Sequence, residues 1–257
     1  MRLGVVSYLN TLPLACGLER FLPGATLVRT SPAEIARELE AGNLDVGLVP
    51  VAAWFERPDW TLIPGLGIAS QGPVGSVVFQ SRRPLAEIAA WAQDPASRTS
   101  NLLAAIWLQE TLGRAVPALP GAATVEARLA EADATVCIGD AALFPTGRPE
   151  VQVDLGEAWT RWTGLPFVYA LLARPGAAAP GLAEALMACY RDNASRLHEL
   201  AHWESPHDPA RRARIESYLR WNIRYRIGAE ELRGLDRFRE LVAAACPASP
   251  KVTHARS

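Results

Sequence analysis

The first eighty residues alternate short apolar runs with segments of helical periodicity. Apolar runs at residues 3–6, 25–29 and 45–49 have the length and composition of buried strands. Helices are predicted after Pro13, at 31–41 and at 50–57; in the second, Ile35, Ala36 and Leu39 share one face. Ser31 is suited to cap that helix and Gly42 to end it. This order of strands and helices predicts a parallel sheet with crossover connections.

A second alternating pattern begins after residue 79. It predicts strands at 134–138, 151–155 and 167–173. It also predicts helices at 102–112 and 124–132, and a third helix that follows the strand at 151–155 and ends at 163. The rest of the chain is predicted to be helical over 181–203, 209–220 and 229–245. Insertion of one such unit into another predicts an α/β, two-lobed type II periplasmic-binding-protein-like fold with two crossover hinge strands. We expect one lobe from 1–80 plus 172–257, a second from 81–171, and a ligand cleft between them.

Four polar turns fall at the ends of predicted strands, at 7–11, 72–76, 97–101 and 139–140, two in each lobe. Ligands of open α/β sheets bind at this edge, where helix N-termini present free amides. Hydroxyl groups, glycines and Arg98 in these turns are suited to a small polyanionic carboxylate. Each turn could equally be a cap or a hairpin without a ligand, and Asp140 could be a cap or a ligand contact.

Composition excludes several classes of function. A net charge of −1 over 257 residues creates no field that would attract nucleic acid or an anionic membrane. The four cysteines are far apart and the four histidines lie in the last quarter, so we expect no metal site and no cofactor. Polar residues and Pro13 interrupt the apolar N-terminal stretch, which therefore lacks a convincing export signal, and we expect a cytoplasmic protein.

Motifs spread over nearly the whole chain resemble the chorismate dehydratase family, the first enzymes of the futalosine route to menaquinone. They occupy 6–14, 45–50, 70–77, 98–100, 138–142, 154–159, 163–170 and 218–238. Several motifs in one order are more specific than any single one. Asn101, where we expect an apolar residue, departs from the pattern and puts only the detail of that turn in doubt. The resemblance also implies a fold similar to type II binding proteins.

The resemblance implies loss of water from chorismate to give 3-[(1-carboxyvinyl)oxy]benzoate. Removal of the ring proton at the carbon carrying the enolpyruvyl ether, with loss of the neighbouring hydroxyl, makes the ring aromatic. We expect Asn10 and Ser76 to position groups while the substrate's own enolpyruvyl carboxylate takes the proton, with Asp140 as the alternative base. The expected substrate-binding residues are Ser7, Tyr8, Thr11, Pro50, Gly75, Val77, Arg98, Thr99, Ser100 and Gly139.

Two other functions are compatible with the same predicted fold. One is a solute-binding protein for a small carboxylate, which would need an export signal. The other is 1,4-dihydroxy-6-naphthoate synthase of the same pathway; the runs at 7–11 and 71–77 favour the dehydratase. The expected partner is a small-molecule substrate, and the sequence does not indicate an oligomeric state.

Overall fold

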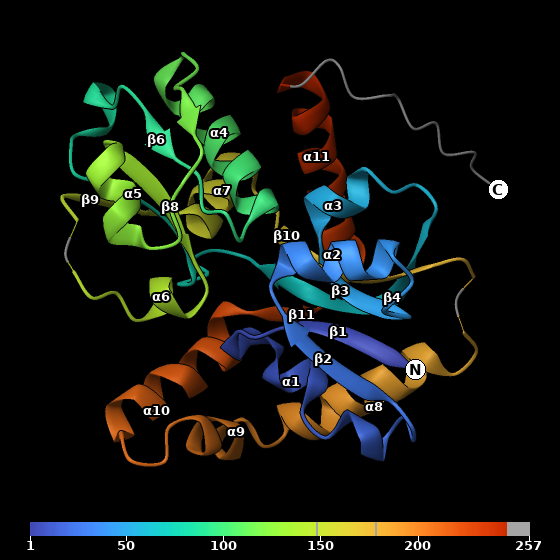
Figure 1. The fold of residues 1–257 in the computed structure, drawn as a ribbon. Helices are drawn as coiled ribbons and strands as arrows, with labels where there is room; N and C mark the ends of the chain where they lie inside the picture. The colour runs from blue at the N-terminus through green and yellow to red at the C-terminus, as the bar shows by residue number, and fades with distance from the viewer. Residues whose placement is uncertain (148, 178, 246–257) are drawn as a thin grey trace.

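Two lobes, each with its own β-sheet, make up the computed structural model, which describes residues 1–147, 149–177 and 179–245 (Figure 1). The first lobe contains a six-stranded sheet in the order β11-β4-β10-β3-β1-β2. The strands are β1 (Arg2–Val6), β2 (Thr26–Thr30), β3 (Val46–Pro50), β4 (Trp60–Ser70), β10 (Phe167–Pro175) and β11 (Arg224–Arg226). β1 pairs in parallel with β2 and β3, as predicted, whereas β10 runs antiparallel to β3 and β4.

Most helices of the chain belong to the first lobe. They are α1 (Leu12–Ala15), α2 (Pro32–Glu40), α3 (Val51–Phe55), α8 (Leu182–Ala194), α9 (Leu197–Glu204), α10 (Pro209–Ser217) and α11 (Ala229–Ala245). The predicted α2 is confirmed: the Ser31 hydroxyl accepts a hydrogen bond from the Glu34 amide, and Ile35, Ala36 and Leu39 are buried. The stretch predicted as one helix over 181–203 is instead α8 and α9, and a π-helical turn, Tyr218–Asn222, follows α10.

The second lobe is built on a five-stranded sheet in the order β7-β6-β8-β5-β9. Its strands are β5 (Val77–Ser81), β6 (Trp91–Ala92), β7 (Ala118–Leu119), β8 (Ala134–Ile138) and β9 (Val151–Asp154). Its helices are α4 (Arg98–Leu112), α5 (Val125–Glu131), α6 (Asp140–Leu143) and α7 (Leu155–Thr163). The polar turn expected at 97–101 is therefore mainly the first turn of α4, because Ser97 caps that helix and accepts from the Ser100 amide.

The chain passes between the sheets at 71–76 and at 164–166, ahead of the expected lobe boundaries. Among the residues that the structure describes, β5 pairs only with strands of the second lobe, and β10 lies wholly in the sheet of the first. Both strands are apolar and largely buried, so their pattern does not reveal which sheet they join. Gly72 and Gly75 have φ angles of 87° and 76°, which allow the turn at the first crossing.

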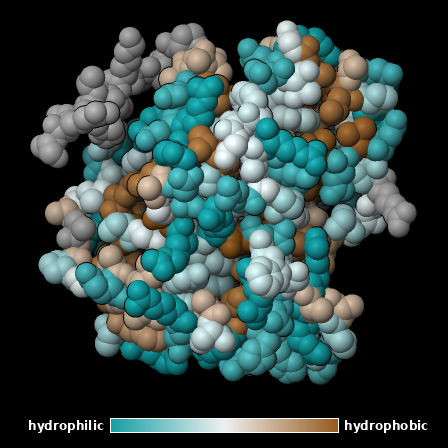
Figure 2. Space-filling view, turned by 180° about the vertical axis from the view of Figure 1, so that it is seen from behind, coloured by the Kyte–Doolittle hydropathy of each residue, from teal (hydrophilic) through white to brown (hydrophobic). Residues whose placement is uncertain are grey.

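Aromatic side chains of the two lobes pack against one another next to the second segment in which the chain passes between the sheets. Trp159 of α7 packs edge-on against Phe167 of β10 and Phe238 of α11. Its indole N–H donates to the Pro166 carbonyl at 3.1 Å, so this buried side chain is fully paired. Seen from behind, the surface is mostly hydrophilic with small groups of hydrophobic side chains (Figure 2). Within the described residues, no helix is long and apolar enough to cross a membrane.

Candidate active site

A cleft between the lobes encloses about 590 Å³ of empty space, part of which is open to solvent. Both sheets and the first crossing segment contribute to its walls. The lining residues are Val6, Tyr8, Asn10, Pro32, Leu48, Pro50, Ile68, Val74, Ser76, Val77, Ser97, Thr99, Ser100, Ile138, Gly139, Tyr169 and Ala170. None of these described lining residues carries an acidic or basic side chain, so the walls offer neutral donors and apolar surface.

Direct contacts connect the lobes across the cleft. The Leu9 amide donates to Asp140 Oδ1 at 3.2 Å, and the Ala52 amide donates to Thr99 Oγ1 at 3.2 Å. Outside the cleft, the Arg98 guanidinium pairs with Glu56 at 2.5 Å. These contacts join α3 and the loop after β1 to the N-termini of α4 and α6, and so define the width of the cleft.

Gly139 permits the close approach of the two lobes at Tyr8. A Cβ on Gly139 would lie 2.7 Å from the Tyr8 ring, closer than such atoms can approach. The Gly139 backbone has φ 66° and ψ −144°, a conformation essentially restricted to glycine. Burial, with smaller effects of Asp94 and Asp140, raises the pKa of Tyr8 to about 12, which keeps its hydroxyl neutral.

The first-lobe wall is the turn that carries Asn10. Thr11 Oγ1 lies 2.9 Å from the Val6 carbonyl and 2.8 Å from the Tyr8 carbonyl, and its one hydrogen bonds to these backbone oxygens. The following residues are held from α8, where the Asn193 amide donates to the Pro13 and Cys16 carbonyls. Asn10 Oδ1 is buried and has no hydrogen-bond partner among the described residues. It is therefore an acceptor available to a ligand.

Ser76 lies at the end of the first crossing segment, and Asp154 determines the path of that segment. The Asp154 carboxylate accepts from the amides of Val74 and Gly75 at 3.0 and 2.6 Å, and it also caps α7. The buried Ser76 hydroxyl accepts a hydrogen bond from the Tyr218 hydroxyl at 2.8 Å. The crossing thus presents Ser76 to the cleft in a defined orientation.

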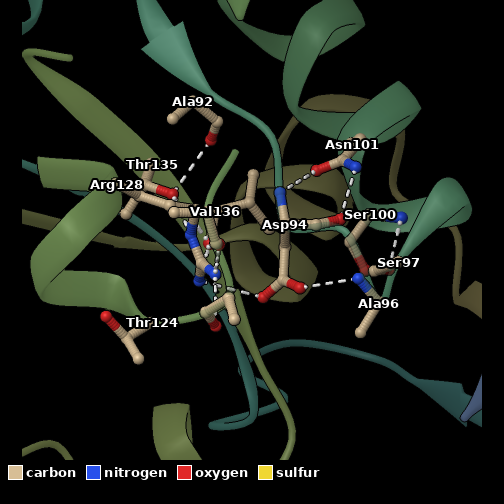
Figure 3. A network of polar contacts seen from close by, with 12 residues as sticks. Ala92, Asp94, Ala96, Ser97, Ser100, Asn101, Thr124, Arg128, Thr135 and Val136 are labelled. Carbon is tan, nitrogen blue, oxygen red and sulfur yellow. Dashed lines mark hydrogen bonds and ion pairs between the residues drawn. The ribbon is translucent and has the colours of Figure 1, made fainter. Parts of the chain in front are cut away.

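A buried polar network supports the second-lobe wall, where α4 begins (Figure 3). Asn101 exchanges two hydrogen bonds with the backbone of Asp94, at 3.0 and 2.9 Å. The Asp94 carboxylate accepts from the Ala96 amide at 2.9 Å and pairs with Arg128 at 3.1 Å. The departure at Asn101 noted in the sequence thereby has a structural reason: its amide ties the loop after β6 to α4.

Arg128 anchors this network. Its guanidinium makes hydrogen bonds to the Thr135 hydroxyl and to the carbonyls of Ala122, Ala123 and Val136, besides Asp94. The side chain is only 2 % exposed, and the paired Asp94 side chain 9 %. Burial raises the pKa of Asp94, and the Ala96 amide and Arg128 oppose that shift. Ser97, Thr99 and Ser100 are consequently held on a rigid support.

Asp140 faces the first lobe and does not line the cleft. Burial raises the pKa of its carboxyl, while the Leu9 amide and Arg211 act in the opposite direction. Arg211 of α10 lies over the Phe144 ring, 3.8 Å from its centroid, a cation–π contact between α10 and the loop after α6.

Many of the residues expected at the site come together in the cleft. Those that line it are Tyr8, Asn10, Pro50, Ser76, Val77, Thr99, Ser100 and Gly139. The others lie beside it: Ser7 is exposed, Thr11 binds the backbone, Gly75 binds Asp154, Arg98 pairs with Glu56, and Asp140 binds the Leu9 amide.

Two tyrosines at the site escaped the sequence reasoning. Tyr169 lines the cleft from β10, where its hydroxyl lies 2.9 Å from Ser70 Oγ, and Tyr218 holds Ser76. Both belong to segments that resemble the family, but their partners lie 99 and 142 residues away, a separation that no local pattern reveals. Within the described residues, no three acidic, His or Cys side chains gather as ligands of a metal ion.

Comparison with known proteins gives concordant matches. A family model described as menaquinone biosynthesis matches residues 1–244. A chorismate dehydratase from Thermus thermophilus is 30 % identical over 269 aligned residues, covering 96 % of each chain. Among solved structures, an Archaeoglobus fulgidus protein has a TM-score of 0.68 at 13 % identity over 95 % of this chain and 97 % of that one. The periplasmic aliphatic sulphonate binding protein of Escherichia coli has a TM-score of 0.64 at 16 % identity, over 98 % and 94 %. The structural matches show the two-lobed type II periplasmic-binding-protein fold.

Proposed function

The chain belongs to the menaquinone-biosynthesis family, and we propose that it removes water from chorismate to give 3-[(1-carboxyvinyl)oxy]benzoate. The observation that carries this proposal is the match to a chorismate dehydratase along 96 % of both chains. The cleft supports it because a small dicarboxylate can be held there by neutral donors. The protein would thus be a hydro-lyase that takes a small molecule as substrate.

The walls of the cleft are suited to hold a dianion without neutralising it. The N-terminus of α4 contributes backbone amides and the hydroxyls of Thr99 and Ser100, and the opposite wall contributes Asn10 and Ser76. Apolar side chains such as Ile68, Val74 and Ile138 exclude water from the ring. Fixed donors of this kind stabilise the negative charge that builds on the ring carboxylate as the proton leaves.

The reaction needs a base, and we propose that the substrate's enolpyruvyl carboxylate serves as one. The ring proton at the ether-bearing carbon moves to that carboxylate, its electron pair enters the ring, and the neighbouring hydroxyl departs as water with the proton that the carboxylate returns. No carboxylate or imidazole of the described residues lines the cleft. Asp140, the alternative base, binds the Leu9 amide across the lobes, which favours the substrate as base.

Asn10 and Ser76 would position the reacting groups. The unpaired Asn10 Oδ1 can accept from the hydroxyl that leaves, and Ser76 can donate to a carboxylate. Tyr8, Pro50, Val77 and Gly139 would shape the substrate pocket from the sides. Ser7, Thr11, Gly75 and Arg98 would act through the backbone and through contacts between the lobes.

We further propose a cytoplasmic location and no nucleic-acid or membrane partner. The net charge of −1 and the biosynthetic conversion of a small metabolite support this proposal.

Purified protein incubated with chorismate tests the function. The expected result is conversion of the chorismate absorbance into that of an aromatic enolpyruvyl ether. Tight binding of chorismate without turnover would favour a solute-binding protein, and neither binding nor turnover would exclude both functions. That last result would make the naphthoate synthase the remaining candidate.

The identity of the base is tested with Asp140→Asn, which keeps an oxygen to accept from Leu9. With the substrate as base, we expect the kcat of this variant to stay within about threefold of wild type, since no proton passes through the side chain. A loss of two or more orders of magnitude with an unchanged fold would make Asp140 the base.

A further inference from the structure

Tyr218 lies directly behind Ser76, at the edge of the cleft. It is the first residue of the π-helical turn that follows α10, and its side chain is 1 % exposed. π-Helical turns cost helix stability and are found frequently at functional sites. From this position, the Tyr218 hydroxyl reaches the crossing segment and donates to Ser76 Oγ at 2.8 Å. Neither the family match nor the sequence motifs assign a role to this side chain.

The hydrogen bond determines the direction in which Ser76 can donate. A phenol has a single hydrogen, and Tyr218 gives it to Ser76 Oγ. No other described residue hydrogen-bonds to Ser76 Oγ, so the serine's own hydrogen has no protein acceptor. Because Ser76 lines the cleft, this hydrogen is available to a bound ligand. Without the phenol, the serine hydroxyl could rotate and turn its hydrogen away from the ligand.

The Tyr218 hydroxyl is neutral in this buried position. Burial raises the pKa of the phenol, and the hydrogen bond to Ser76 opposes that shift only in part.

We propose that Tyr218 is a positioning residue for the proposed dehydration: it orients the Ser76 hydroxyl as a donor toward the substrate. The inference rests on the proposed function. Tyr218 itself touches neither the reacting carbon nor the leaving hydroxyl, and it supplies no proton to the reaction. Its effect is to keep the Ser76 hydroxyl in one orientation before the substrate binds.

The test is a double-mutant cycle with a matched control. Tyr218→Phe removes one oxygen and should lower kcat/KM about tenfold, mainly through kcat, because the loss of one orienting hydrogen bond corresponds to about that factor. The control is Tyr225→Phe, the same change at a buried tyrosine on the adjacent β11 whose hydroxyl has no partner among the described residues. Its kcat/KM should stay within about twofold of wild type.

The cycle is completed in the Ser76→Ala background. If Tyr218 acts through Ser76, Tyr218→Phe should cost at most about twofold further once the hydroxyl is gone. An equal loss in both backgrounds, or an active Tyr218→Phe variant indistinguishable from wild type, would overturn the inference. Urea unfolding of each variant shows whether it is folded; should Tyr218→Phe fail to fold, the cycle is run with Tyr218→Met. A wild-type protein inactive on chorismate would overturn the proposed function itself.

Discussion

Replacement of Arg128 by methionine tests the physical account of the second lobe. The substitution keeps an unbranched apolar stem but removes all five hydrogen bonds of the guanidinium. It leaves Asp94 as an unpaired charge in a buried position. Removing one partner of a buried ion pair costs about 3–5 kcal/mol, and the loss of carbonyl partners acts in the same direction. We therefore expect the free energy of unfolding to fall by about 4 kcal/mol.

The measurement is equilibrium urea unfolding followed by tryptophan fluorescence, since Trp91 and Trp107 lie in the core of this lobe. The same loss corresponds to a fall in Tm on the order of 10 °C for a chain of this size. Arg161→Met is the matched control: Arg161 pairs with Glu157 on the surface, with its side chain 78 % exposed, and its loss should cost under about 0.5 kcal/mol.

A second substitution separates the effect of the unpaired Asp94 charge from the effect of losing the Arg128 contacts. Asp94→Asn in the Arg128→Met background removes the unpaired charge and should recover part of the lost stability, whereas Asp94→Asn alone should destabilise the protein. The account would be refuted if Arg128→Met lowered the free energy of unfolding by less than about 1 kcal/mol, or if the double variant recovered no stability. Either result would mean that the Asp94–Arg128 ion pair does not stabilise the network behind α4.

Three further predictions concern the walls of the cleft. Asn101→Ala should lower the free energy of unfolding by about 1–3 kcal/mol and raise the KM for chorismate, because both hydrogen bonds to the Asp94 backbone are lost; denaturation and initial rates measure these effects. Gly139→Ala should reduce kcat/KM at least tenfold, since its Cβ would displace the Tyr8 ring; wild-type kinetics would contradict the close packing. The raised pKa of Asp140 means that ionisation of this carboxyl in the folded protein costs stability as the pH rises above the ordinary pKa, so the free energy of unfolding of Asp140→Asn should increase relative to wild type as the pH rises above about 4, as urea unfolding at a series of pH values measures.

Local patterns predicted much of the fold because the spacing of apolar residues in a segment reflects which of its side chains are buried. The predicted strands at 3–6, 134–138 and 167–173 and the helix at 31–41 all exist, each with a mostly apolar run or a clear apolar face. The edge strand β11 was missed because only one of its three residues, Tyr225, is buried. Where the chain changes sheets is a property of pairing between distant strands, and the apolar pattern is the same on either side of the crossing.

The candidate site was predicted only where its residues lie in turns. Asn10, Ser76 and Thr99 stand at strand or helix ends, where polar side chains are expected to face a ligand. Tyr169 and Tyr218 reach the site from a strand interior and a helix end, and tyrosine in such positions is typical of a core. Arg98 lies beside Thr99 at the start of α4 and was expected to face the ligand for the same reason. Its long side chain instead extends out of the cleft to Glu56.

The central claim is that this cleft removes water from chorismate. Its most direct test is a time course with chorismate, in which products of the wild-type protein and of a variant with both Asn10→Ala and Ser76→Ala are identified by mass spectrometry. The account predicts that the wild-type product is chorismate less one molecule of water, and that the double variant, though folded, forms it at least a hundredfold more slowly. Chorismate recovered unchanged from the wild-type protein, or equal rates for the two proteins, would contradict it.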